Sequence, residues 1–296
     1  DRCLSRGLGD VYKRQHHRDA ALNIISRSPR FDLTHHDMDA PPWWHYRKRK
    51  TLYADGFAPQ GSRMLMQFLL VRENGPEKFL EWESDFEHVE AWLESLRPPE
   101  WPGEIDTRLA GKGEEIFREH CGRCHGEYGE SEAYPEAVVP IGEIGTDRVR
   151  FDALTNKERS ALNDSWFGHF GRDAAVIGSR QRPSGYVAPP LDGVWASAPY
   201  FHNGSVPTLW HVLHSESRPS VWRRTPVGYD MQKVGLEIEE RNVSWFAEAV
   251  SDGMPSAQRR QYFDTSKLGK SARGHSYPDV LTHLERTAVL EYLKTL

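Results

Sequence analysis

The chain has 296 residues, a formal charge of −5 at pH 7 and 38% hydrophobic residues. This length allows one large domain or two small ones. The mild acidity gives no reason to expect binding to nucleic acid or to an anionic membrane surface. No apolar run approaches the roughly 20 residues that cross a bilayer, so the sequence predicts no membrane span.

The first 15 residues do not look native. Residues 9–15, Gly-Asp-Val-Tyr-Lys-Arg-Gln, resemble read-through of sequencing-adaptor DNA at the end of a fragmentary gene. We therefore set residues 1–15, which include Cys3, apart from the fold prediction. We expect that the natural N-terminus is missing and that a signal peptide for export has been lost with it.

Two amphipathic helices are predicted with similar sequences at their ends. A capping box that starts at Ser84 predicts a helix that ends before Pro98, because proline cannot continue it. A second capping box, starting at Thr282, predicts a helix that runs to the end of the chain. The likeness between residues 91–96 and 291–296 indicates a weak internal repeat, and therefore two related domains.

The most informative stretch is residues 121–125, Cys-Gly-Arg-Cys-His, which is the attachment signal for a c-type haem. Residues 111–120 predict a short amphipathic helix leading into it. Two thiols at this spacing can bond to the two vinyl groups of one haem, and the next histidine can bind the iron. The sequence therefore predicts Cys121 and Cys124 as covalent haem attachments and His125 as the proximal iron ligand.

Two other kinds of site share a C-x-x-C pattern. A structural zinc site needs about four Cys or His ligands, usually as a second pair at matching spacing. Outside the motif the chain has one further cysteine, Cys3. A thioredoxin-like redox pair is expected in a βαβ setting and without a histidine directly after it. Both interpretations are weaker than haem attachment.

The predicted fold is mainly α, with c-type cytochrome domains and long irregular loops. Such a domain opens with the helix that carries the haem motif and closes with an amphipathic helix, which predicts a cytochrome c domain with one haem c at residues 105–296. The Pro- and Gly-containing stretch at 98–104 is predicted as a linker. Residues 16–97 are predicted to be the remainder of a first cytochrome c-like domain that lacks its haem motif.

A family resemblance rests on three further stretches. Residues 189–209, with Pro-Tyr-Phe-His-Asn-Gly at 199–204, resemble the second cytochrome domain of the bacterial di-haem cytochrome c peroxidase superfamily. Residues 39–53, with their Pro-Pro-Trp-Trp, and residues 262–275 resemble its rubber-oxygenase-like branch. The resemblance spans about residues 36–296 and says little about the substrate.

The resemblance implies two haems with different tasks. One would react with a small-molecule oxidant, peroxide or dioxygen, and the other would exchange electrons with it and with a redox partner protein. The haem at Cys121–His125 is expected to relay electrons in a periplasmic or otherwise exported haem-dependent oxidoreductase. One alternative is a non-enzymatic electron-transfer cytochrome with a single haem. Another is a dioxygenase that cleaves an unsaturated hydrocarbon.

The second axial ligand of this haem has several candidates. Peroxidases of the superfamily often use a methionine after the Pro-Tyr-x-His motif, but residues 210–218 contain none. In the oxygenase-like branch a histidine in a Gly-His loop before the last helix fills this role, so we predict His275 as the distal ligand. For His202 we expect a structural role. The other candidates are Met231, Met254, His202, His211 and His214. Arg218, Trp222 and Tyr229 fit the family pattern without an assigned role.

Overall fold

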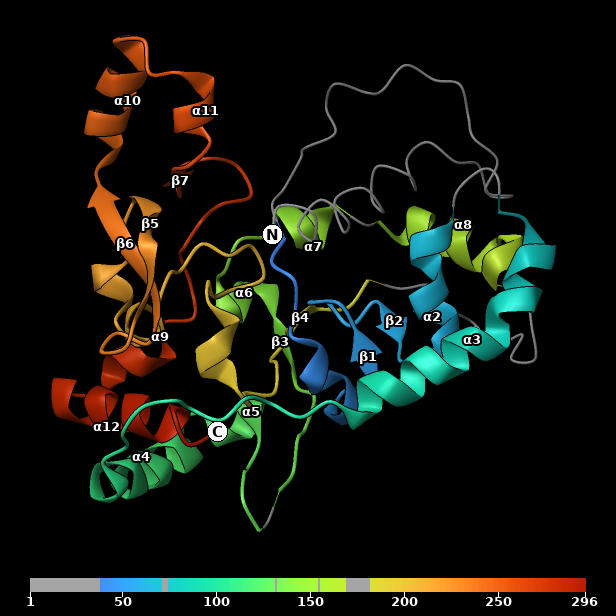
Figure 1. Cartoon of the computed structure of the whole chain (residues 1–296), viewed down its shortest axis with the longest axis horizontal. Helices are drawn as coiled ribbons and strands as arrows, with labels where there is room; N and C mark the ends of the chain where they lie inside the picture. Colours follow the sequence, from blue (N-terminus) through green and yellow to red (C-terminus); the bar gives the residue numbers. More distant parts are fainter. Residues whose placement is uncertain (1–37, 71–73, 131, 154, 169–181) are drawn as a thin grey trace.

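The structure is a computed structural model that describes residues 38–70, 74–130, 132–153, 155–168 and 182–296 (Figure 1). Residues 1–15, with Cys3, lie outside these ranges, so the prediction that they are not native stays a prediction. The α-helices are α2 (Ser62–Met66), α3 (Pro76–Ser95), α4 (Thr107–His120), α5 (Gly122–His125), α6 (Ile141–Ile144), α7 (Val149–Asp152), α8 (Asn156–Asp164), α9 (Leu209–Leu213), α10 (Val243–Ser251), α11 (Ser256–Arg259) and α12 (His283–Leu293). The 3-10 helices are η1 (Trp43–Lys48), η2 (Gln67–Leu69), η3 (Trp166–Gly168), η4 (Val194–Ser197), η5 (Ser215–Ser217) and η6 (Tyr277–Val280).

The strands form small antiparallel sheets. β1 pairs with β2, β3 pairs with β4, and β5 lies between β6 and β7. The strands are β1 (Thr51–Leu52), β2 (Ala58–Pro59), β3 (Val138–Pro140), β4 (Gly185–Val187), β5 (Val221–Asp230), β6 (Gly235–Arg241) and β7 (Phe263–Asp264).

The prediction of a mainly α fold is wrong. Helices make up 46% of the described residues and strands 14%, so the class is mixed. The largest difference is the hairpin of β5 and β6, where the apolar Leu236 and Ile238 alternate with glutamates. This period of two residues is the sequence signal of a strand, and it lies in a stretch for which the sequence analysis predicts no strand.

The helix before the linker begins earlier than its capping box predicts. α3 starts at Pro76, with Gly75 as its N-cap, so Ser84 lies two turns inside the helix. Proline is well suited to the first helical position because its φ angle is already helical and its missing N–H would have no partner there. The second capping box is confirmed: Thr282 and Glu285 cap each other at the start of α12.

Two hydrophobic cores lie on opposite sides of the molecule in Figure 1. One is built around α4, α9 and α12, and includes Phe117, Leu209 and Val289. The other lies between α2, α3 and η3, and includes Phe79 and Phe167. This second core contains residues from both predicted domains, and the domain boundaries stay a prediction.

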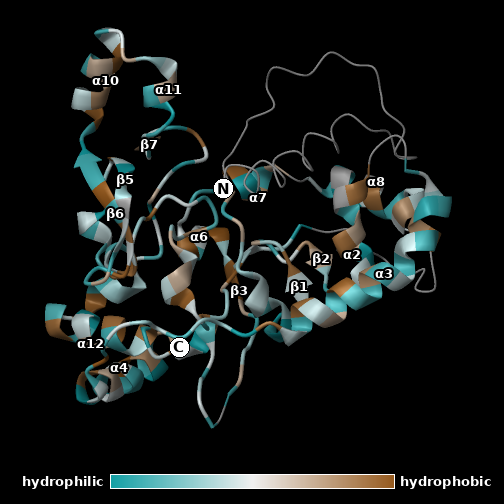
Figure 2. Ribbon diagram, in the orientation of Figure 1, coloured by the Kyte–Doolittle hydropathy of each residue, from teal (hydrophilic) through white to brown (hydrophobic). Residues whose placement is uncertain are grey.

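Hydrophilic colours dominate the outer side of α3 in Figure 2.

The helix before the haem motif is held by a close crossing with the last helix. α4 and α12 pack more extensively than any other two elements among the described residues. At their crossing, Gly113 lies directly against the backbone of Ala288: a β-carbon placed on Gly113 would be 2.0 Å from the Ala288 carbonyl oxygen. Only glycine permits so close an approach, and Phe117 and Tyr292 pack beside it with ring centroids 5.3 Å apart.

No helix in the described part of the chain is both long and apolar enough to cross a membrane.

Candidate cofactor site

The C-x-x-C-H motif is placed by the end of α4. The side chain of Asp106 caps the start of α4, and the helix ends where Cys121 begins the short α5. The chain turns sharply directly after His125 because Gly126 has a φ angle of +90° and lies close to Ala133. The motif is therefore a single, mostly half-buried turn between a long helix and a tight bend.

Both thiols of the motif are free and partly buried. Burial raises the pKa of Cys121 to about 12, so this thiol is protonated at neutral pH. Reactive thioredoxin-like cysteines have a lowered pKa, so this environment does not favour a redox pair. Within the described ranges, no group of three or more His, Cys, Asp or Glu side chains is arranged to hold a metal ion.

His125 is fixed by hydrogen bonds on both its ring and its backbone. Its Nδ1 atom lies 2.9 Å from the carbonyl oxygen of Pro189. The hydroxyl of Tyr128 donates to the His125 carbonyl at 2.9 Å and accepts from the backbone N–H of Leu191 at 2.7 Å. Metal-binding histidines typically donate their second ring nitrogen in this way, which orients the other nitrogen toward the metal. Burial lowers the pKa of His125, which favours the neutral, ligating form.

His275 lies in a tightly anchored loop. Its backbone N–H donates to Ile144 at the end of α6, at 2.7 Å, and its φ angle is +47°. Gly274 packs against Gly145 so closely that a β-carbon would come within 2.3 Å of the Gly145 backbone. A positive φ angle is uncommon for residues other than glycine, although histidine adopts it more readily than most, and such conformations are concentrated at functional sites.

The rings of His125 and His275 lie in edge-to-face contact, with centroids 6.1 Å apart and planes inclined at 68°. Two imidazole nitrogens that bind one metal ion from opposite sides, at about 2.1 Å each, hold their ring centroids roughly 6.4 Å apart. Nδ1 of His275 is buried and has no hydrogen-bond partner among the described residues. The separation of the two rings is therefore compatible with an iron atom between them, beside the two thiols of the motif.

The other candidates for the distal ligand lie elsewhere. Of the candidates, only His275 has a ring contact with His125 among the described residues. His202 packs on Tyr186 with ring centroids 4.3 Å apart, and His214 stacks on Trp210 at 4.2 Å. His211 is fully buried, with its Nδ1 atom 2.7 Å from the Thr208 hydroxyl. Met231 is 42% exposed, and Met254 packs beside the separate cluster of Val221, Phe246 and Tyr262.

The loop that holds His125 is itself held by η1. The backbone carbonyl of Asp192 accepts from Trp44 Nε1 and contacts His45 Nε2, both at 2.7 Å. The Asp192 carboxylate accepts from Lys48 Nζ at 2.6 Å. Because Asp192 follows Pro189 by three residues, these contacts connect the N-terminal part of the described chain with the acceptor of the His125 ring.

The burial of His45 is expected to make the folded protein less stable in acid, because the protonated ring would be charged in a desolvated site. Burial lowers the pKa of His45 to about 4, so the folded protein keeps this ring neutral while the unfolded chain protonates it below about 6.5. The contribution of neutral His45 to the free energy of unfolding is therefore fully present above pH 6.5. It is lost as the pH falls from 6.5 toward 4, by about 3 kcal/mol in total. In urea titrations at several pH values, His45→Gln, which keeps an amide donor, should show a flatter pH dependence. Parallel curves for the two proteins would contradict this.

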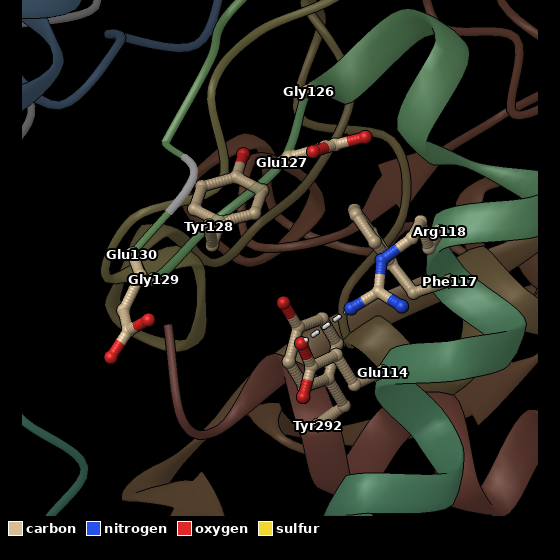
Figure 3. Close-up of a pocket in the computed structure, with 9 residues that line it drawn as sticks. All are labelled: Glu114, Phe117, Arg118, Gly126, Glu127, Tyr128, Gly129, Glu130 and Tyr292. Atoms are coloured by element: carbon tan, nitrogen blue, oxygen red, sulfur yellow. Dashed lines mark hydrogen bonds and ion pairs between the residues drawn. The ribbon is translucent and has the colours of Figure 1, made fainter.

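A surface cavity of about 370 Å³ lies beside the motif, between α4, α12 and residues 126–130 (Figure 3). Glu114 and Arg118 form an ion pair at 2.8 Å at its edge, and the rings of Tyr128 and Tyr292 face it. None of the four predicted site residues lines this cavity. It is therefore distinct from the space between His125 and His275.

Comparison with known proteins gives a match in the stretch that holds the His125 ring. Residues 185–223 match the family described as RoxA-like, cytochrome c-like. The match supports a rubber-oxygenase-like cytochrome c. It covers Pro189 and Asp192, and a RoxA-like cytochrome c domain implies haem c, in agreement with the C-x-x-C-H motif outside the matched residues.

Two curated relatives come from Sinorhizobium fredii (strain NBRC 101917 / NGR234). The chain is 30% identical to uncharacterized protein y4iM over 248 residues, which is 70% of this chain and 53% of the relative. It is 28% identical to uncharacterized protein y4iJ over 263 residues, which is 68% of this chain and 41% of the relative. The chain thus spans about half the length of the curated relatives it matches.

Several residues of the site were not assigned a role from the sequence. The hydroxyl of Tyr128 and the backbone carbonyl of Pro189 contact His125, and the backbone carbonyl of Asp192 contacts η1. The side chain of Arg218 contacts the His275 loop. Tyr128 lies three residues after His125, and its closeness in the sequence is the one signal that could have drawn attention to it. A backbone carbonyl leaves no comparable trace, since every residue carries one.

Proposed function

We propose that residues 105–296 hold one haem c, bound by Cys121 and Cys124 and ligated by His125 and His275, and that its function is electron transfer. The observation that carries the proposal is the contact between the imidazoles of His125 and His275, whose ring centroids are 6.1 Å apart, at the C-x-x-C-H motif. The cytochrome c-like match supports it. When bound, a haem c supplies one-electron oxidation and reduction.

The residues of the chain would divide the work as follows. Cys121 and Cys124 hold the porphyrin by thioether bonds, so the cofactor does not dissociate. His125 is kept in one tautomer by Pro189, which directs its Nε2 atom to the iron. His275 would be the second protein ligand of the iron, and its loop would keep the ring in place. If both histidines bound the iron, they would leave no ligand position for peroxide or dioxygen, which favours electron transfer over oxygen chemistry.

For the whole protein we propose a haem-dependent oxidoreductase of the di-haem peroxidase or oxygenase type, exported before its haem is attached. Its catalytic haem, its small-molecule oxidant and its redox partner would then involve chain beyond this sequence. A non-enzymatic cytochrome with a single haem is the alternative. The pyridine haemochrome assay on the full natural protein separates the two, because two haems per polypeptide support the enzyme and one supports the carrier.

Substitutions at the haem site test the proposal directly. Cys121→Ser combined with Cys124→Ser should abolish covalent haem, seen as loss of haem staining after denaturing electrophoresis. His275→Ala should retain covalent haem but change the ferric absorption spectrum from low-spin to high-spin. His214→Ala, also a buried histidine, should leave the spectrum unchanged. An unaltered spectrum in His275→Ala would remove this residue from the iron.

A further inference from the structure

Arg218 joins two segments that are far apart in the sequence. It follows η5 and precedes β5, and its guanidinium donates hydrogen bonds of 2.6 to 3.3 Å to five backbone carbonyls. Two of these carbonyls end α9 and three belong to the loop of His275. The acceptors are His211, Val212, Ala272, Gly274 and His275.

The pattern of contacts indicates the task of this arginine. A guanidinium has five N–H donors in a rigid fork, and here each of its three nitrogens is directed at carbonyl oxygens. In the described part of the chain Arg218 forms no ion pair with a carboxylate. Its donors are thus occupied by the backbone, so it is arranged to hold two segments together and not to bind an anion.

A second contact leads from Arg218 to the ring of His275. The guanidinium carbon lies 4.9 Å from the ring centroid of Phe201, and that ring lies 5.9 Å from the His275 ring. Phe201 and His275 both have positive φ angles, +68° and +47°. Conformations of this kind persist only where the surroundings enforce them. Arg218 contacts both strained residues, through the ring of one and the carbonyl of the other.

We propose that Arg218 is a positioning residue that keeps His275 opposite His125, and thereby keeps His275 on the haem iron. This rests on the proposed function, because it assumes that His275 is a ligand. The α9 side of the contact is anchored in the hydrophobic core through Leu209 and Leu213. The His275 side is an irregular loop, so Arg218 transfers the rigidity of the core to the loop.

The test uses the full chain with covalently attached haem and the variants Arg218→Lys and Arg218→Met. Lysine keeps the positive charge but lacks the planar guanidinium with its five N–H donors. It can therefore bind only some of the five backbone carbonyls that Arg218 contacts. The control is Arg223→Met. Arg223 also combines hydrogen bonds, to Glu239, with an aromatic contact, to Tyr262, but it contacts neither Phe201 nor the His275 loop.

We expect a high-spin fraction in ferric Arg218→Met and a smaller one in Arg218→Lys. Carbon monoxide should bind the ferrous protein faster by about tenfold or more in Arg218→Met, as for loss of at least one net hydrogen bond. Added imidazole should restore the low-spin spectrum, and Arg223→Met should match the wild type. Hydrogen exchange of residues 272–276 should rise in both Arg218 variants. If Arg218→Met does not fold, Arg218→Lys decides.

The outcomes separate this proposal from the proposed function. If His275→Ala loses the low-spin spectrum while both Arg218 variants keep the wild-type spectrum, carbon monoxide rate and exchange, the role of Arg218 is overturned and ligation by His275 stands. If His275→Ala keeps the low-spin spectrum, ligation by His275 fails, and with it the effect of Arg218 on the iron. Faster exchange in residues 272–276 would then leave Arg218 a purely structural contact.

Discussion

Replacing Gly113 with alanine is expected to lower the free energy of unfolding by about 3 kcal/mol. The added β-carbon would lie 2.0 Å from the Ala288 carbonyl oxygen and 2.9 Å from the Tyr292 β-carbon, so α4 and α12 must move apart. Neither obstacle is the flexible end of a side chain. Because α4 leads directly into the C-x-x-C-H motif, we also expect a lower yield of protein with covalent haem. Urea denaturation of the haem-loaded protein measures the loss.

Gly111 supplies the control for this substitution. It lies in the same helix, two residues earlier, and a β-carbon there would meet no atom within 4 Å. Gly111→Ala should therefore raise stability, by up to about 1 kcal/mol, because alanine favours the helix more than glycine does. Equal effects at the two positions would show that helix propensity, and not the crossing of α4 and α12, determines the result.

Asp55→Asn is expected to cost about 3 to 5 kcal/mol, since it removes the carboxylate from a buried ionic cluster. One oxygen of Asp55 accepts from Arg150 at 3.0 Å and the other from Arg159 at 2.7 Å. All three side chains are at most 1% exposed. Asparagine has nearly the same shape as aspartate, so the loss in the free energy of unfolding reflects the missing negative charge. The two guanidinium groups would stay buried without the carboxylate that they share.

The comparison variant is Asp152→Asn. Asp152 also pairs with two arginines, Arg148 at 2.8 Å and Arg182 at 3.1 Å, but its side chain is 43% exposed. Water screens such pairs, and the expected loss is within about 1 kcal/mol. Chemical denaturation of both variants measures the two losses in the free energy of unfolding, so that they can be compared. A loss at Asp55 no greater than that at Asp152 would mean that the cluster rearranges or admits water.

Local signals in the sequence predicted local structure well. The capping box at Thr282 depends on a partner three residues away, and the structure contains it. The amphipathic helix before the haem motif is likewise confirmed. The hairpin of β5 and β6 was missed, although its alternation of apolar and charged residues was present in the sequence.

The chemistry proposed for the site can be read from local sequence. Two thiols and a histidine at C-x-x-C-H spacing predict haem attachment without knowledge of the fold, because all three groups lie within about one helical turn. How the two histidines are held depends on long-range contacts that are visible in the folded chain. Pro189 lies 64 residues from His125. The guanidinium of Arg218 joins α9 to carbonyls that lie 54 to 57 residues after Arg218 in the chain. The acceptors in these contacts are backbone carbonyls, which every residue has. A pattern of side chains in the sequence therefore cannot predict them.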